Sequence, residues 1–249
     1  MRYFIELSYN GRNYHGWQIQ PNEISIQETI ERALSLLLKN KTSIVGCGRT
    51  DTGVHASQFF AHFDAKHEID KEKLKFKLNS FLPDDIAIFQ IVSVIEDAHA
   101  RFQAVSRSYQ YKISLVKDVF QKELSMEVSQ AVLNVELMNK AAKMLMDYSD
   151  FKCFSRTKTD VKNYLCDITE AYWEQNEDQL VFTIKANRFL RNMVRAVVGT
   201  LLEVGKGKMS IEGFQNVIES RDRTRAGASV KAKGLFLTSV EYPNHIFNK

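Results

Sequence analysis

The run GCGRTDTGVHA, residues 46–56, is the most informative stretch of this sequence. Three glycines within eight positions allow a backbone that adopts left-handed conformations and approaches a ligand closely. In this flexible frame an arginine, Arg49, and a carboxylate, Asp51, stand two residues apart. A carboxylate placed in this way can be a nucleophile, a general base or the cap of a turn, and the run alone leaves these roles open.

Strand and helix patterns alternate on both sides of this run. The first half predicts strands at 2–9, 54–63 and 86–95 and helices at 26–39 and 70–82. The second half predicts strands at 107–116, 164–174, 179–186 and 235–242 and helices at 136–147, 188–204 and 210–220. The sequence therefore indicates an α/β protein of two similar subdomains with mixed sheets, residues 1–105 and 106–249.

Two local signals sharpen this outline. Ser25 and Glu28 form a capping box, in which the serine hydroxyl accepts an amide proton at the third helical position and fixes the helix start. The strand at 86–95 is apolar almost throughout, which predicts burial on both of its faces.

Composition places the chain among ordinary globular proteins, with 249 residues of which 44% are hydrophobic and 26% charged. No stretch approaches the roughly 18 apolar residues of a membrane span, so we expect no membrane association of that kind. The first residues lack the pattern of a signal peptide. Three cysteines without a CxxC pair predict a reduced, cytoplasmic protein without a structural metal.

The net charge of +4 is concentrated in one region. Residues 185–234 contain 11 basic and 4 acidic side chains, a net charge of +7, whereas residues 1–105 carry −1 and residues 106–184 carry −2. Such a concentration is typical of a surface that binds a polyanion, although a solvated basic face explains it as well.

Helical spacing within this basic region places three arginines on one face. Arg188, Arg191 and Arg195 lie at i, i+3 and i+7 of the predicted helix at 188–204, opposite an apolar stripe. Because no acidic residue separates them, they would repel one another unless an anion lay along them.

Seven segments in this order resemble the TruA family of tRNA pseudouridine synthases over essentially the whole chain. The segments are residues 9–20, 48–56, 79–86, 99–102, 107–111, 150–154 and 189–199. The resemblance implies the pseudouridine synthase fold with a central cleft. It also implies an isomerase that converts uridine to pseudouridine at positions 38, 39 and 40 of the tRNA anticodon stem-loop.

The resemblance also assigns catalytic roles. Asp51 matches the catalytic aspartate, which attacks C1′ of the uridine or assists its departure as a glycal. Tyr109 matches the active-site tyrosine, whose ring stacks on the uracil and whose hydroxyl is a candidate base for the C5 proton. Arg195 matches the basic residue that keeps the aspartate ionised and oriented, and Arg49 matches a residue implicated in base flipping.

Further binding residues follow from the same resemblance and from the arginine spacing. The candidates for phosphate or ribose contacts are His99, Arg101, Arg156, Arg188 and Arg191. The family works as a homodimer on tRNA, and isomerisation requires no cofactor and no metal. This agrees with the absence of nucleotide-binding and metal-ligand motifs from the sequence.

The sequence departs from the family pattern in one segment. Ala228 and Lys231 occupy positions that are commonly proline in the family, so the local loop conformation is open. Three other functions also stay open at this point: a non-catalytic RNA-binding module, a pseudouridine synthase acting at other RNA positions, and a hydrolase that uses Asp51.

Overall fold

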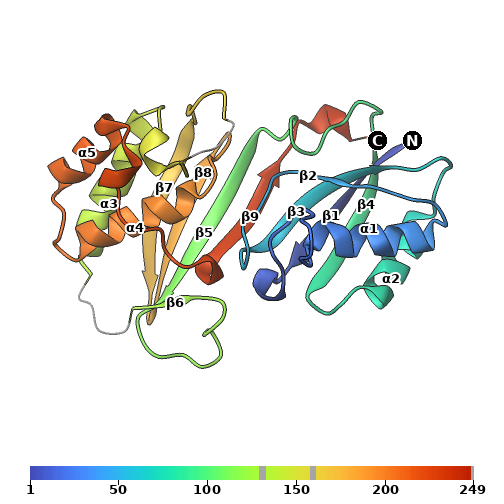
Figure 1. Ribbon diagram of the computed structural model, residues 1–249, viewed down its shortest axis with the longest axis horizontal. Helices are drawn as coiled ribbons and strands as arrows, with labels where there is room; N and C mark the ends of the chain where they lie inside the picture. Colours follow the sequence, from blue (N-terminus) through green and yellow to red (C-terminus); the bar gives the residue numbers. More distant parts are fainter. Residues whose placement is uncertain (129–132, 158–160, 248–249) are drawn as a thin grey trace. The chain divides into compact units, whose positions relative to one another are not determined.

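The computed structural model describes residues 1–128, 133–157 and 161–247, in which strands and helices alternate along the chain (Figure 1). The chain divides into two compact units: Met1–Arg107 with Phe236–Lys249, and Ser108–Leu235. Each unit combines strands with helices, so the α/β class predicted from the sequence is confirmed.

The first unit is built around strand β1 (Arg2–Tyr9), which pairs antiparallel with β3 (His55–Asp64) and with β4 (Ile86–Val94). The short strand β2 (Val45–Gly46) pairs antiparallel with β3, and β9 (Leu235–Glu241) runs parallel beside it. The sequence analysis placed the boundary at residue 105 and therefore assigned β9 to the second subdomain. Its pairing with β3 joins residues about 180 positions apart, which local periodicity does not reveal.

Two helices accompany this sheet. Helix α1 (Ile26–Leu37) begins at Ser25, whose Oγ accepts a hydrogen bond from the Glu28 amide at 3.2 Å, as the capping box predicts. Helix α2 (Lys71–Phe81) is capped by Asp70 and ends where Leu82 becomes extended before Pro83.

Strand β4 does not have the double burial that its apolar sequence predicts. It is the edge strand of this sheet, and its Phe89 side chain is 50% exposed while Gln90 is also exposed. The prediction was wrong because an apolar run fixes the type of element but not the number of layers that cover it.

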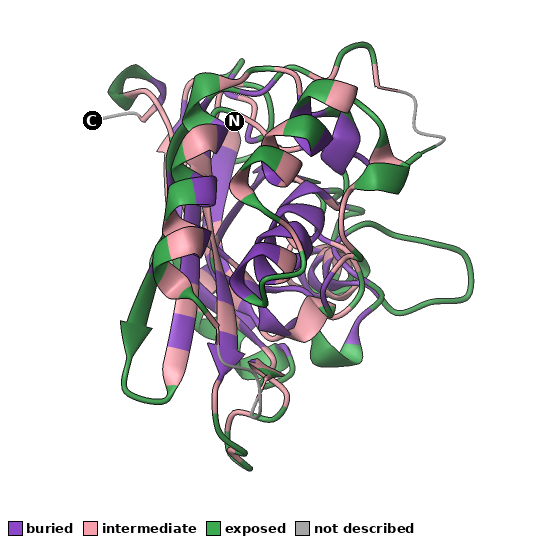
Figure 2. Cartoon of the chain, turned by 90° about the vertical axis from the view of Figure 1, so that its left-hand side faces the viewer, coloured by how far each residue is buried: buried purple, intermediate pink, exposed green. Residues whose placement is uncertain are grey.

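In the second unit, strand β8 (Gln179–Ala186) lies between β5 (Ser106–Ser114) and β7 (Ile168–Asn176). The two-residue strand β6 (Met126–Glu127) pairs parallel with β5. Helices α3 (Val135–Met144), α4 (Met193–Gly205) and α5 (Ile211–Ser220) pack on one another, and α3 contacts β7. Figure 2 shows the buried residues of the chain in purple where helices and sheet meet.

Helix α4 is the buried centre of this unit, with all of its residues buried except Arg195 and Glu203. It begins at Met193 rather than at residue 188, so the predicted helix start was wrong. Asn192 has φ 65°, a left-handed conformation that ends a right-handed helix, and the chain before it forms a loop. Of the three arginines predicted to share a helix face, only Arg195 lies in the helix.

Candidate functional site

The glycine-rich run forms a loop between β2 and β3. A second loop of the first unit, which contains Gly11 and Gly16, packs against it. A Cβ atom on Gly11 would lie 1.9 Å from the Val54 carbonyl oxygen, and one on Gly16 would lie 2.3 Å from the Thr50 oxygen. Gly16 also has φ +83°, which side chains disfavour. The two loops therefore touch backbone to backbone, a contact that only glycine permits.

Thr50 anchors the residue before the candidate aspartate. Its buried hydroxyl lies 2.9 Å from the Tyr9 hydroxyl, and its carbonyl accepts a hydrogen bond from the Trp17 amide at 3.2 Å. On the other side of Asp51, the Val54 amide donates to the Asp51 carbonyl at 3.1 Å. Asp51 is half-buried on this fixed backbone, while Arg49 is exposed. The sequence predicted both residues but not the Tyr9–Thr50 contact, which joins two distant segments.

Arg107 is a second support that the sequence analysis did not assign. Its Nη2 donates to the Cys47 carbonyl at 3.0 Å and to the Arg101 carbonyl at 2.6 Å. One guanidinium thus connects the glycine loop to the segment that carries His99 and Arg101. Its place in the strand that carries Tyr109, within the family-like segment 107–111, is the signal that could have indicated it.

A cavity of about 160 Å³ opens beside the glycine loop. Trp17, which stacks on Phe59 at 4.1 Å between ring centroids, forms part of its wall. Arg49 and Arg101 both line it, so the structure brings together two arginines that the sequence places 52 positions apart. A small cavity with two guanidinium groups suits an anionic or hydrogen-bonding ligand.

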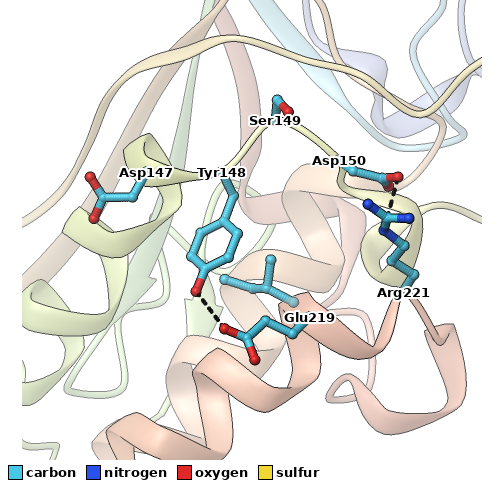
Figure 3. A pocket seen from close by; sticks show the side chains of 7 residues that line it. Asp147, Tyr148, Ser149, Asp150, Glu219 and Arg221 are labelled. Carbon is cyan, nitrogen blue, oxygen red and sulfur yellow. Dashed lines mark hydrogen bonds and ion pairs between the residues drawn. The ribbon is translucent and has the colours of Figure 1, made fainter.

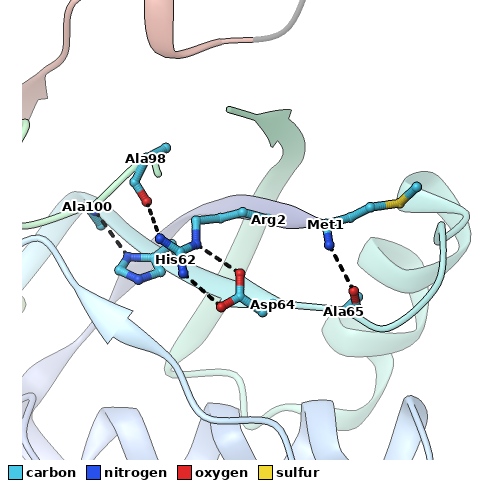
Figure 4. Close-up of polar contacts among 7 residues, drawn as sticks. All are labelled: Met1, Arg2, His62, Asp64, Ala65, Ala98 and Ala100. Atoms are coloured by element: carbon cyan, nitrogen blue, oxygen red, sulfur yellow. Dashed lines mark hydrogen bonds and ion pairs between the residues drawn. The ribbon is translucent and has the colours of Figure 1, made fainter. Parts of the chain in front are cut away.

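The segment that carries His99 and Arg101 is fixed to the sheet by two polar side chains (Figure 4). Arg2 donates to the Ala98 carbonyl at 3.0 Å while it forms a paired contact with Asp64, both distances being 2.8 Å. His62 accepts a hydrogen bond from the Ala100 amide at 3.1 Å through Nδ1. Since an acceptor nitrogen carries no proton, this contact requires neutral His62.

The His62 contact predicts a pH-dependent stability. Burial, with smaller effects of Arg2 and His99, lowers the pKa of His62 to about 4, against an ordinary value near 6.5. The unfolded chain therefore takes up a proton as pH falls below about 6.5, whereas the folded chain does not until about pH 4. We expect His62 to lower the free energy of unfolding by about 2 kcal/mol between pH 7.5 and pH 5.

Urea unfolding of wild type and His62→Gln at both pH values measures this effect. Glutamine keeps an acceptor for the Ala100 amide but does not titrate, so the variant should lose about 2 kcal/mol less stability than wild type on acidification. Equal losses in the two proteins would show that His62 is not responsible.

Tyr109 lies on β5 in the second unit. Its half-buried ring meets Phe189 edge to face, with 5.1 Å between centroids and an interplanar angle of 88°. Tyr111, two residues on, is fully buried, and its hydroxyl donates to the Lys231 carbonyl at 2.8 Å. Burial also raises the pKa of Tyr111 above its ordinary value. The two tyrosines thus differ: Tyr111 is fully buried and bonded within the fold, whereas Tyr109 is partly exposed.

The other three arginines predicted for binding, Arg156, Arg188 and Arg191, lie outside the helices and strands of the second unit. The Arg156 amide donates to the Arg191 carbonyl at 3.0 Å, and both side chains are exposed. Arg188 donates through Nη1 to Asn163 at 2.9 Å. Arg156 and Arg191 are therefore neighbours, a closeness that the sequence analysis did not predict.

Arg195 is the basic residue of α4, and it is bonded to the loop that follows α5. Its Nε donates to the Val230 carbonyl at 2.8 Å, and the Val230 amide donates to the Arg195 carbonyl at 3.2 Å. Side chain and main chain of Arg195 are thus both held by one residue.

A larger cavity of about 380 Å³ lies in the second unit, away from all these residues (Figure 3). Tyr148 donates to Glu219 at 3.1 Å, and Arg221 contacts Asp150 at 3.2 Å. Because Asp147 also lines the cavity, its walls carry three carboxylates and one guanidinium, a net negative charge that disfavours phosphate. Its size does not make it the functional site.

In residues 1–128, 133–157 and 161–247, no three His, Cys, Asp or Glu side chains come together in a way that could hold a metal ion. Among the helices of the described residues, none has the length and apolarity needed to cross a bilayer. The three cysteines are buried free thiols.

Comparison with known proteins gives a consistent result. Residues 141–243 match a family model described as tRNA pseudouridine synthase. The chain is 53% identical over 247 residues to the tRNA pseudouridine synthase A of Parabacteroides distasonis, covering 99% of this chain and 98% of the relative. It is 51% identical to the protein of that name from Bacteroides fragilis, covering 99% and 98%, and 40% identical to that from Bacillus subtilis, covering 98% and 100%.

Proposed function

Because this chain belongs to the tRNA pseudouridine synthase family, we propose that it isomerises uridine to pseudouridine at positions 38, 39 and 40 of the anticodon stem-loop of tRNA. The observation that carries the proposal is Asp51, half-buried on a loop whose backbone is fixed on both sides of it. A surface that only binds RNA gives no reason to hold a carboxylate in this way.

The reaction exchanges one bond to C1′ for another. The N1–C1′ bond breaks, the uracil turns, a C5–C1′ bond forms, and the proton leaving C5 is balanced by one gained at N1. No electron is gained or lost overall, so the chemistry calls for acid, base and nucleophile alone. We propose no cofactor and no metal for it.

In this proposal Asp51 is the group that acts at C1′, either by attack or by assisting formation of a glycal. The half-buried ring of Tyr109 stacks on the uracil, and its hydroxyl accepts the C5 proton. Arg195 keeps the Asp51 carboxylate ionised and oriented. The reaction requires all three groups at one nucleotide.

Arg49 is proposed to enter the base stack when the target uridine flips out. It is exposed, and it lies beside a cavity that a second arginine, Arg101, also lines. A planar guanidinium can fill the space of a base and donate hydrogen bonds to its neighbours.

Recognition of the tRNA is proposed to depend on backbone contacts. The exposed or half-exposed side chains of His99, Arg101, Arg156, Arg188 and Arg191 are the candidates, within a chain whose excess positive charge lies at 185–234. Contacts to phosphate fix register without reading base identity, which suits an enzyme that serves three neighbouring positions.

We further propose that the protein works as a homodimer in the cytoplasm, where tRNA is modified. The family resemblance supports the dimer. Sedimentation velocity measures it directly, because a dimer has twice the 28.7 kDa mass of the chain.

The experiment that tests the function is incubation of wild-type protein with unmodified tRNA, followed by carbodiimide treatment and primer extension. We expect new stops at positions 38, 39 and 40 on substrates that carry uridine there. Stops at other positions would assign a different RNA target. Bound tRNA without any stop would indicate a binding module instead.

A further inference from the structure

The segment Ala226–Lys231, here called the strap, lies directly on the backbone of helix α4. A Cβ atom on Gly199 of the helix would lie 1.8 Å from the Ala228 carbonyl oxygen, and one on Gly227 would lie 3.0 Å from the Gly199 backbone. The Gly227 amide also donates to the Thr200 hydroxyl at 2.9 Å. Glycine on both sides therefore allows a contact closer than any side chain would permit.

Val230, the residue before the end of the strap, holds Arg195. Val230 accepts from the Arg195 Nε at 2.8 Å and donates to the Arg195 carbonyl at 3.2 Å. Since a guanidinium is planar, a fixed Nε restricts where both terminal nitrogens can lie. The strap thus restricts the position of the Arg195 guanidinium through Val230.

Arg223 fastens the other end of the strap. Its Nη1 donates to the carbonyls of Ala226 and Gly227 at 3.3 and 3.1 Å, and its Nη2 donates to the Ser229 hydroxyl at 2.9 Å. The strap contains no proline, so hydrogen bonds rather than ring constraints limit its motion.

Ser229 connects the strap to the start of α4. Its hydroxyl oxygen also accepts from the Asn192 Nδ2 at 2.6 Å, and Asn192 is the left-handed residue before the helix. Arg223 is in turn held by its short 3-10 helix, Arg223–Arg225, which Asp222 caps through the Thr224 amide at 2.9 Å. The contacts form one connected network from Asp222 to Arg195.

We propose that Arg223 and Ser229 are positioning residues that act through the strap to orient Arg195 for the isomerisation. This inference rests on the proposed function, because it takes Arg195 as part of the catalytic machinery. Neither residue needs to touch the RNA for this role. If the strap is loosened, we expect a slower chemical step. The tRNA affinity should change little, apart from the small effect of the positive charge that a substitution of Arg223 removes.

Arg223→Gln and Arg225→Gln form the matched pair that tests it. Both remove one positive charge from the same 3-10 helix, but the three hydrogen bonds to the strap come from Arg223. We expect Arg223→Gln to lower the single-turnover rate at saturating tRNA by about 10- to 100-fold, the usual effect of misplacing a reacting group by about 1 Å. Arg225→Gln should weaken tRNA binding only, to the same small extent as Arg223→Gln.

Two measurements separate positioning from general loss of structure. Hydrogen exchange at the Val230 amide should become faster in Arg223→Gln, while the amides within α4 stay protected and Arg225→Gln resembles wild type. Adding Arg223→Gln to Arg195→Ala should cause no further loss of rate, because the two residues act in one chain of contacts. If Arg223→Gln does not fold, Ser229→Ala provides the same test with a smaller deletion.

The outcomes are distinct. The proposal would be overturned if Arg223→Gln had the same single-turnover rate as Arg225→Gln; where Arg223→Gln does not fold, the same comparison is made with Ser229→Ala. It would also be overturned if the rate losses of Arg223→Gln and Arg195→Ala multiplied in the double variant. Absence of pseudouridine with wild-type protein would instead overturn the proposed function, and the exchange at Val230 would still report whether Arg223 holds the strap.

Discussion

Asp51→Ala is expected to eliminate detectable pseudouridine formation, with a fall of at least about 10³-fold in the single-turnover rate, as is usual when the group that acts on the reacting atom is removed. A methyl group in place of the carboxylate can neither attack C1′ nor assist formation of a glycal. Tritium release from C5-labelled uridine in tRNA measures the loss, and carbodiimide primer extension checks it at single nucleotides.

The control is a second aspartate-to-alanine substitution, which removes the same charge at a position outside the glycine loop. Asp84, which is exposed beyond Pro83, serves this purpose, and Asp84→Ala should retain wild-type turnover. The alanine at position 51 keeps the carbonyl that accepts from the Val54 amide, so the loop should persist and the variant should bind tRNA. Activity in Asp51→Ala would remove the aspartate from its proposed role.

The fold was predictable wherever a local signal determined it. The Ser25 cap and the spacing of Ile26, Ile30 and Leu34 placed α1 correctly, because capping and one-sided burial act within a few turns. The start of α4 was not predictable, because every residue from 188 to 192 is compatible with a helix by type. The helix starts only after Asn192, because this residue is left-handed and its side chain is bonded to Ser229, 37 positions away.

The candidate site divides in the same way. Asp51 and Arg49 could be proposed from the sequence because both stand in one short run that resembles a family motif. Their supports could not be recognised, since Tyr9 reaches Thr50 across 41 positions and Arg107 reaches the Cys47 carbonyl across 60. Arg223 was visible only as one charge in a basic region, although its side chain makes three hydrogen bonds to the strap. A short motif thus indicated the candidate residues, whereas the contacts that fix their loop join distant segments.

Arg195→Ala is expected to lower turnover by about 10²- to 10³-fold while tRNA binding weakens only a few-fold. Removal of one group that stabilises charge at a reaction centre usually has an effect of this size on rate, and one lost positive charge has a small effect on an interface with many. The Val230 amide keeps its bond to the backbone carbonyl of residue 195, so the strap should remain in place. Single-turnover kinetics and filter binding separate rate from affinity, and thermal unfolding confirms that the variant is folded.

Arg191→Ala is the matched comparison, because Arg191 is exposed on the loop before α4 and is proposed to contact phosphate. It should show the reverse pattern, with weaker binding and an unchanged rate at saturating tRNA. Arg195→Lys should not restore turnover. In the planar guanidinium, Nε bonds Val230 and this fixes the orientation of the two terminal nitrogens, whereas an ammonium has no such group. A binding defect in Arg195→Ala as large as its rate defect would instead make Arg195 a residue that holds RNA, and the strap would then position an RNA contact rather than a catalytic group.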